Sequence, residues 1–506
     1  MPLLSFVKSM CLQGLEGVLI NVEVDISSGL PYWEIVGLPD TNIRESKDRV
    51  KTAIKNSGIE LLSRRYVINL SPASVRKNGA SLDLAIAIGI LISMKIIKCT
   101  NLRDTILIGE LSLNGDLVGI NGVLPICIEA QKCGIKRIIL PKVNAKEASV
   151  AEGVDVIGIR NLKELIDFFN GKKKIPEEKF DRNNIFKSVN KSNLDYCDVK
   201  GHEISKRVLE IAAAGSHNCL MIGSPGSGKT MMAKRLPSIL PNLSFDESLE
   251  ITQIHSIAGN LKDRNIITER PFRAPHHTIS EKSLIGGGKN PKPGEVSLAH
   301  LGVLFLDELL EFNKNIIEVL RTPMEDKKIN INRLESKVTY PCNFMTIASM
   351  NPCPCGYYGS NIKECTCTNV KRKNYISKLS RPLLDRFDLH IQVSSVNYNR
   401  LRDKKIEKSL EIRNRVNKAR TIQINRYTED RIYFNSDLTA NMIEKYCNID
   451  DDTFNLLKEY LECKKLSTRS YSKILKVSRT IADLENEENI RKEHVLEAIQ
   501  YRILDS

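Results

Sequence analysis

The sequence predicts a multidomain α/β protein whose central domain is a parallel sheet flanked by helices. The chain has 506 residues, about twice the length at which a single hydrophobic core stops growing. Its first third alternates strand-like and helix-like segments. Its middle contains an apolar strand, a glycine-rich loop and a helix in direct succession, and its C-terminal part has a charged, helical pattern.

The composition is that of a globular protein. Hydrophobic residues make up 42% and charged residues 27% of the chain, which argues against a disordered or fibrous protein. The longest apolar run, 84–94, is too short to span a membrane, and the N-terminus lacks the features of a signal peptide. The 13 cysteines are an odd number in a chain without an export signal, so a disulfide framework is not expected. We therefore expect a cytoplasmic protein with no membrane partner.

The charge balance is basic. Lys and Arg outnumber Asp and Glu by 75 to 61, which gives a net charge of +14. Such a surplus attracts polyanions such as nucleic acid, but a generic lysine-rich surface gives the same charge. Charge is therefore compatible with a DNA partner without establishing one.

Changes in pattern along the chain predict three domains and a linker. Apolar and polar residues alternate from Ile20 to Ile26 as in a half-buried strand. Asp40 is a candidate helix cap and Asn114-Gly115 a candidate hairpin turn. The predicted segments are an α+β domain at 1–170, a solvated polar linker at 171–194, a P-loop core at 195–396 and a helical C-terminal domain at 397–506.

A phosphate-binding loop lies between an apolar strand (218–222) and a helix (231–236). The stretch Gly-Ser-Pro-Gly-Ser-Gly-Lys-Thr at 223–230 matches the G-x-x-x-x-G-K-[ST] pattern. Backbone N–H groups would close around the phosphates, Lys229 would reach the β and γ phosphates of ATP, and Thr230 would ligate Mg²⁺. The alternative is a glycine-rich turn without a ligand. The predicted nucleotide-binding residues are Gly223, Ser224, Pro225, Gly226, Ser227, Gly228, Lys229 and Thr230.

A second motif supports a nucleotide site. The apolar strand 303–306 ends in the carboxylates Asp307 and Glu308. Asp307 would hold Mg²⁺ and Glu308 would polarise an attacking water. The alternative is a buried strand that merely ends in a solvated acidic pair.

Three further polar residues are candidates for catalysis. Asn351 follows the apolar strand 346–350, where an amide can orient water against the γ phosphate, although Asn after a strand is also a common turn former. Arg386 lies among apolar residues, and a guanidinium there suits transition-state phosphate charge or a structural ion pair. Arg469 is similarly a candidate arginine of the helical domain or an ordinary exposed one.

Four cysteines cluster on one short stretch. Cys353 and Cys355 are followed after nine residues by Cys365 and Cys367. Four thiolates suit a closed, structural Zn²⁺ site, and the alternative is a set of reduced structural cysteines. The basic run 371–373 follows directly, either as a surface for DNA or as a solvated charge run.

In this order the motifs resemble those of the magnesium-chelatase-like AAA+ ATPases of the ComM or YifB family. The stretches that carry the resemblance are 198–203 (Asp-Val-Lys-Gly-His-Glu), 272–278 (Phe-Arg-Ala-Pro-His-His-Thr), 293–300 (Pro-Gly-Glu-Val-Ser-Leu-Ala-His), 351–356 (Asn-Pro-Cys-Pro-Cys-Gly) and 480–484 (Thr-Ile-Ala-Asp-Leu). They span nearly all of the core and the C-terminal domain. The resemblance implies that these two domains are an AAA+ core and its helical lid.

The resemblance implies a ring-forming ATPase, usually hexameric, with active sites between subunits. It implies that Asn351 is the first sensor, Arg386 the finger that reaches a neighbour's ATP, and Arg469 the second sensor. It also implies that the stretch 273–294 is an insertion typical of this branch.

The N-terminal domain resembles the Lon-protease fold. The stretch 77–81 (Lys-Asn-Gly-Ala-Ser) lies where Lon carries its nucleophilic serine. Leu124 occupies the position where Lon has the lysine that activates this serine. We therefore expect a non-proteolytic domain, in which Ser81 caps a helix.

The resemblance implies an ATP-driven motor on DNA, as in the branch migration attributed to ComM during natural transformation. Two alternatives stay open: a chelatase-type motor that inserts metal into a tetrapyrrole, and an ATP-driven unfoldase or protease.

Overall fold

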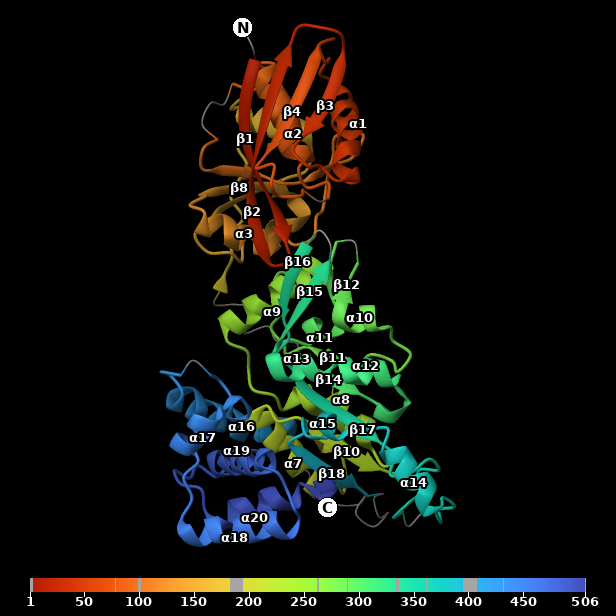
Figure 1. The fold of residues 1–506 in the computed structure, drawn as a ribbon. Helices are drawn as coiled ribbons and strands as arrows, with labels where there is room; N and C mark the ends of the chain where they lie inside the picture. The colour runs from red at the N-terminus through yellow and green to blue at the C-terminus, as the bar shows by residue number, and fades with distance from the viewer. Residues whose placement is uncertain are drawn as a thin grey trace.

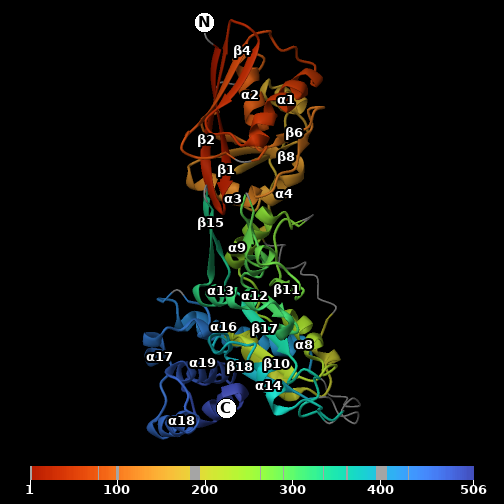
Figure 2. The same ribbon diagram turned by 45° about the vertical axis from the view of Figure 1, so that its right-hand side comes forward.

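The computed structural model describes residues 3–77, 79–98, 102–182, 194–261, 264–288, 290–333, 336–360, 363–394, 407–430 and 432–505. The N-terminal domain, the core and the helical C-terminal domain form an elongated molecule with the N-terminal domain at one end (Figure 1). The view turned by 45° shows the same arrangement (Figure 2). Of the helices in these ranges, none is both long and apolar enough to cross a membrane.

The N-terminal domain is a mixed seven-stranded sheet in the order β3-β4-β2-β1-β5-β8-β9. The predicted alternation is confirmed, because Ile20, Val22, Val24 and Ile26 are all buried on one face of β2. The predicted cap is confirmed as well: Asp40 Oδ1 accepts the N–H of Ile43 at 2.9 Å and starts α1.

The elements of this domain are β1 (Leu3–Gln13), β2 (Glu16–Ser27), β3 (Tyr32–Val36), α1 (Thr41–Asn56), β4 (Arg65–Ser71), α2 (Asp83–Ser93), β5 (Thr105–Leu107), β6 (Glu110–Leu111), β7 (Leu117–Val118), α3 (Val123–Lys132), β8 (Arg137–Pro141), α4 (Ala145–Ala148), β9 (Asp155–Ile159) and α5 (Leu162–Phe169). The Asn114-Gly115 turn joins β6 to β7, as predicted.

The expectation that Ser81 caps a helix is wrong. The N-cap of α2 is Leu82, and no side chain caps this helix end. Asp83 in its first turn is buried and instead forms an ion pair with Arg49 at 2.9 Å. Leu124 is buried in the core of the domain, and its N–H donates to Glu147 Oε1 at 3.0 Å.

The core is a parallel five-stranded sheet in the order β11-β14-β17-β10-β18, with helices on both faces. Its elements are α7 (Glu203–Gly215), β10 (Cys219–Gly223), α8 (Lys229–Arg235), α9 (Phe245–Ala258), β11 (Phe272–Arg273), α10 (Glu281–Ile285), β12 (Gly286–Gly287), β13 (Lys292–Pro293), α11 (Glu295–Leu298), β14 (Val303–Leu306), α12 (Lys314–Val319), α13 (Arg321–Asp326), β15 (Lys328–Arg333), β16 (Ser336–Pro341), β17 (Met345–Met350), α14 (Asn369–Ile376), α15 (Arg381–Leu384) and β18 (Leu389–Val393). Strands β10, β14 and β17 are buried throughout, as expected for a parallel sheet covered on both faces.

The C-terminal domain is helical, as predicted, and packs against the core through α7. Its helices are α16 (Ser409–Arg426), α17 (Ala440–Tyr446), α18 (Asp451–Cys463), α19 (Thr468–Leu484) and α20 (Lys492–Gln500). A buried hydrogen bond of 2.7 Å joins His217 Nε2, after α7, to the hydroxyl of Thr480 on α19. Apolar packing and this polar contact together fix the helical domain on the core.

The N-terminal domain contacts the core through α9 and the β15–β16 hairpin. The half-buried Glu147 accepts a hydrogen bond from the Ser256 hydroxyl of α9, and desolvation raises the pKa of this carboxyl. Phe245, Leu249 and Ile266 of the core pack into the apolar cluster of the N-terminal domain. The β15–β16 hairpin reaches up to the same domain (Figure 2).

The first part of the predicted linker lies on the N-terminal domain. The N–H of Glu178 donates to Val156 O at 2.9 Å, and its carboxylate pairs with Lys142 at 2.6 Å. Phe180 packs with the apolar cluster of the same domain. Residues 183–193 of the predicted linker, and the predicted boundary at 396–397, lie outside the described residues.

Candidate active site

Strand register brings the predicted catalytic segments to one edge of the core sheet. Ile222 pairs with Met350, so Gly223 at the start of the phosphate loop lies beside Asn351. Leu306 pairs with Ala348, so Asp307 lies beside Ser349. Because the strands are parallel, all of these residues lie at or just after carboxyl ends, where ligands of open α/β sheets bind.

The phosphate loop has the backbone that its glycines predict. Gly226 and Gly228 have φ angles of 75° and 88°, in the left-handed region that favours glycine. Lys229 Nζ donates to the carbonyls of Gly223 at 2.7 Å and Ser224 at 2.9 Å, so the amine bridges two carbonyl groups at the start of the loop. Burial lowers the pKa of Lys229, and the nearby Asp307 and Glu308 partly oppose this effect.

Asp307 is held by two hydroxyl groups. Thr230 Oγ1 donates to its Oδ2 at 2.8 Å, and Ser349 Oγ donates to its Oδ1. The predicted magnesium ligands Thr230 and Asp307 therefore touch each other. This set of one hydroxyl and one carboxylate oxygen fits Mg²⁺, which accepts few protein ligands and keeps several waters.

The sequence reasoning missed Ser349. Its hydroxyl also accepts the N–H of Glu308 at 3.2 Å, so one side chain orients both carboxylate residues. Ser349 is fully buried at the end of an otherwise largely apolar strand. A polar residue near the end of an apolar strand is the feature of the sequence that could have identified Ser349.

Glu308 has a left-handed backbone, with a φ angle of 53°. A residue with a side chain adopts this conformation at a cost, and such residues concentrate at functional sites. The conformation directly follows β14 and turns the chain at Glu308, the residue expected to polarise water.

Arg386 and Arg469 lie at the opposite edge of the same sheet. They share a cavity of about 390 Å³ with Asn218, at the amino end of β10, and Phe344, at the amino end of β17. The phosphate loop does not line this cavity. Since β10 has five residues at about 3.3 Å each, the two edges are roughly 16 Å apart. Within one chain the structure therefore brings together Lys229, Thr230, Asp307 and Asn351, but not Arg386 and Arg469.

Five cations line the cavity together with four carboxylates, those of Glu325, Asp385, Asp388 and Asp437. Lys327, Lys473 and Lys476 also line it. Burial alone would raise the pKa of Asp388, but Lys473 and His217 hold it well below its usual range. Arg386 donates to the Arg321 carbonyl at 3.2 Å and pairs with Glu325. Ion pairs of this kind keep several cations close together in one cavity.

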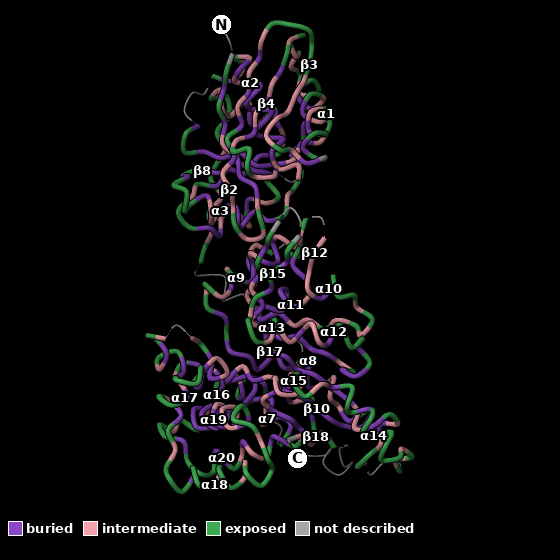
Figure 3. The backbone as a smooth tube through the Cα atoms, viewed as in Figure 1, coloured by how far each residue is buried: buried purple, intermediate pink, exposed green. Residues whose placement is uncertain are grey.

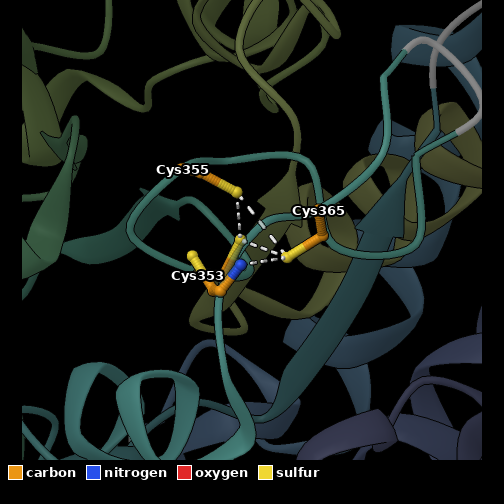
Figure 4. A group of neighbouring side chains, drawn as sticks. Cys353, Cys355 and Cys365 are labelled. Carbon is orange, nitrogen blue, oxygen red and sulfur yellow. Dashed lines mark hydrogen bonds between the residues drawn. The ribbon is translucent and has the colours of Figure 1, made fainter.

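The four clustered cysteines converge as the zinc prediction requires. The sulfur atoms of Cys353, Cys355 and Cys365 face one another (Figure 4), at 3.3 to 3.7 Å. With Cys367, all four sulfurs lie within 4.8 Å of one another. A tetrahedron of thiolates with Zn–S bonds of about 2.3 Å has sulfur separations of about 3.8 Å. The residues present therefore fit a zinc ion.

A phosphate loop beside an acidic strand end, on a parallel sheet with a helical C-terminal domain, defines a P-loop protein of the AAA+ class. Comparison with protein families agrees. Residues 195–401 match the family described as magnesium chelatase, subunit ChlI; 22–144 match subunit ChlI of Mg-chelatase; and 406–502 match the C-terminal part of the same subunit.

The chain belongs to the ComM/YifB family of magnesium-chelatase-like AAA+ proteins. It is 39% identical over 504 residues to competence protein ComM of Haemophilus influenzae, covering 99% of this chain and 98% of that one. It is equally identical to the uncharacterized protein YifB of Escherichia coli, covering 99% and 97%. More distant similarity extends to Lon protease 2 of Bacillus subtilis, 26% identical over 168 residues, 30% of each chain.

Proposed function

We propose that this chain is an ATP hydrolase that assembles into a ring, with six subunits as the expected number, and moves along DNA. Branch migration of joined strands is the reaction we propose for it. The observation that carries the ATPase proposal is Asp307, held between Thr230 and Ser349 beside the phosphate loop. This is the arrangement that holds Mg²⁺ against the β and γ phosphates in P-loop ATPases, and Glu308 would orient the attacking water.

The separation of the candidate residues onto two edges of the sheet supports a ring-shaped assembly. An active site that needs Arg386 cannot be completed within one chain, because the cavity of Arg386 and Arg469 lies at the other edge from the phosphate loop. Head-to-tail contact between copies would place Arg386 and Arg469 of one subunit against the phosphates bound by the next, and such contacts form rings where the rotation between copies closes. In this arrangement Arg386 is the arginine finger, Arg469 the second sensor and Asn351 the sensor of the bound nucleotide.

DNA is the proposed track for two reasons. The net charge of +14 favours a polyanion. The relative from Haemophilus influenzae, similar over its whole length, is named a competence protein.

We propose that Cys353, Cys355, Cys365 and Cys367 hold a structural Zn²⁺. The sulfur separations support the ion, and four thiolates leave no position open for a substrate. A bound zinc would fix the loop that follows Asn351.

The alternative functions rest on weaker similarity. The magnesium-chelatase 38 kDa subunit of Chlorobaculum parvum is 23% identical over 227 residues, 40% of this chain and 59% of that one. A chelatase motor would use the same ATPase core. An unfoldase is the second alternative, prompted by the likeness to Lon protease 2.

The test is ATP hydrolysis by the purified full-length chain, with and without single-stranded and four-way-junction DNA. We expect DNA to raise the rate several-fold and added salt to suppress the increase, because salt competes for phosphate contacts. Glu308→Gln is the inactive control, expected to keep ATP binding. If DNA does not change the rate but Glu308→Gln still abolishes it, the chain is an ATPase that does not act on DNA. The chelatase and unfoldase alternatives would then be favoured.

A further inference from the structure

The loop with the four cysteines carries an unusual share of the positive charge. We call residues 352–360 and 363–381 the cysteine module. It contains six cations and one carboxylate, Glu364, so these 28 of 506 residues supply five of the fourteen net positive charges. The cations are Lys363, Lys371, Arg372, Lys373, Lys378 and Arg381.

These cations are available to a ligand. None of the six forms an ion pair with another residue that the structure describes. Buried or half-buried arginines elsewhere, such as Arg207, Arg270 and Arg426, are each paired with a carboxylate. Figure 3 shows the backbone around α14 mostly in the exposed colour. In Figure 1 the module projects from the core on the side away from the helical domain.

Aromatic rings lie between the cations. Arg372 stacks over Tyr358 with its guanidinium carbon 3.8 Å from the ring centroid, and half of Tyr358 is exposed. Lys363 Nζ lies 5.7 Å from the Tyr357 ring. Cations that contact phosphates, interleaved with rings on which bases stack, are the surface that single-stranded nucleic acid requires.

The module is also attached to the nucleotide site at two points. Gly356 packs so closely on the phosphate loop that an added Cβ would lie 2.6 Å from Pro225 Cδ. The hydroxyl of the buried Tyr375 on α14 lies close to the backbone N–H of Asn351; burial raises the pKa of this hydroxyl, and the N–H partly opposes the rise. A displacement of the module would therefore reach both the loop that binds phosphate and the candidate sensor.

We infer that the cysteine module is a binding surface for the backbone of single-stranded DNA, and that its contacts with Pro225 and Asn351 transmit this binding to the ATPase site. This inference rests on the proposed function. It assigns a contact with single-stranded DNA to residues outside the ATPase site, and it gives Tyr375 the role of a positioning residue for Asn351.

The binding part is tested by charge reversal in the full-length protein. The variant is Lys371→Glu, Arg372→Glu and Lys373→Glu together, with fluorescence anisotropy of a labelled oligo-dT strand as the readout. We expect affinity at least tenfold lower and a shallower salt dependence, by about 2 in the slope of log K against log salt for three lost phosphate contacts. The matched control reverses Lys172, Lys173 and Lys174, another exposed basic run on the N-terminal domain, and should bind as the wild type does.

The transmission part is tested by Tyr375→Phe, which keeps every charge and removes the hydroxyl that meets Asn351. We expect this variant to bind oligo-dT with wild-type affinity, while its ratio of DNA-stimulated to unstimulated ATPase rate falls at least threefold. A residue with a merely structural role would lower both rates together and leave the ratio unchanged.

Three outcomes would overturn the inference. Wild-type affinity in the charge-reversed variant, with wild-type stimulation, would show that the strand binds elsewhere. Wild-type affinity with altered ring assembly would make the module a contact between subunits. A wild-type protein that neither binds nor responds to DNA would instead reject the proposed function itself.

Discussion

The two edges of the core sheet carry charge in different ways. At the carboxyl edge, Asp307 is oriented by two short hydroxyl contacts, and Lys229 is folded onto its own loop. At the amino edge, five cations and four carboxylates line one cavity, and three of the cations form ion pairs there. The first edge contains most of the groups of the proposed site for a triphosphate and its metal ion. The second has a surplus of one positive charge and contains Arg386 and Arg469, the two arginines proposed to meet the nucleotide bound by a second copy of the chain.

The largest expected effect tests whether the two edges meet between subunits. Arg386→Ala should lower ATP hydrolysis by about 1,000-fold, because an arginine finger stabilises transition-state charge. Lys229→Ala should be inactive as well. Mixing the two variants should restore hydrolysis, since up to about a quarter of the interfaces in a random mixed ring join an intact loop to an intact finger. A mixture as inactive as its components would show that each site lies within one chain.

The next effect compares two hydroxyls on one strand. Ser349→Ala should lower ATP hydrolysis about tenfold and raise the Mg²⁺ requirement, because a hydrogen bond to a charged group is worth about 1.5–3 kcal/mol. Thr346→Val is the control at the amino end of β17, where the buried Thr346 hydroxyl has no hydrogen-bond partner among the described residues. Equal rates for the two variants would contradict the role of Ser349.

A smaller effect is expected for the cysteine cluster that adjoins the carboxyl edge. Cys365→Ser should lose one equivalent of zinc, lower the unfolding temperature by several degrees and weaken nucleotide binding, since Gly356 supports Pro225. Cys463→Ser, at an exposed cysteine of the helical domain, should keep its zinc content. Elemental analysis and thermal unfolding measure both. If the wild type purifies under mild conditions with no zinc and binds none when it is added, the cysteines are structural thiols.

The smallest expected effect lies outside the core. Ser81→Ala should change no activity, because the resemblance to Lon puts Leu124, which is buried, at the position of the lysine that Lon uses as its base. Casein hydrolysis measures this. Hydrolysis that is present in the wild type and absent in the variant would show that another base activates Ser81.

Local signals predicted much of the fold. The alternation in β2, the Asp40 cap and the phosphate loop each depend on residues close together in the sequence, and all appear in the structure. Register between parallel strands then brings Asp307 to the loop, which the two motifs together implied.

Features set by distant partners could not be predicted. Ser81 fails to cap its helix because Leu82 begins the turn and the next residue, Asp83, pairs with Arg49, far away in the sequence. The role of Ser349 depends on the neighbouring strand β14, and the packing of Gly356 on Pro225 joins residues more than a hundred positions apart. The grouping of Arg386 with Arg469 likewise depends on how the helical domain docks.

The apolar contact between the N-terminal domain and the core determines how this chain can be divided in the laboratory. A cut within 183–193 would separate two folded parts but expose Phe245, Leu249 and Ile266 on one fragment and their apolar partners on the other. Freshly exposed apolar patches favour association. Fragments produced together should therefore copurify, and the isolated ATPase fragment should need polar substitutions at these three positions to stay in solution.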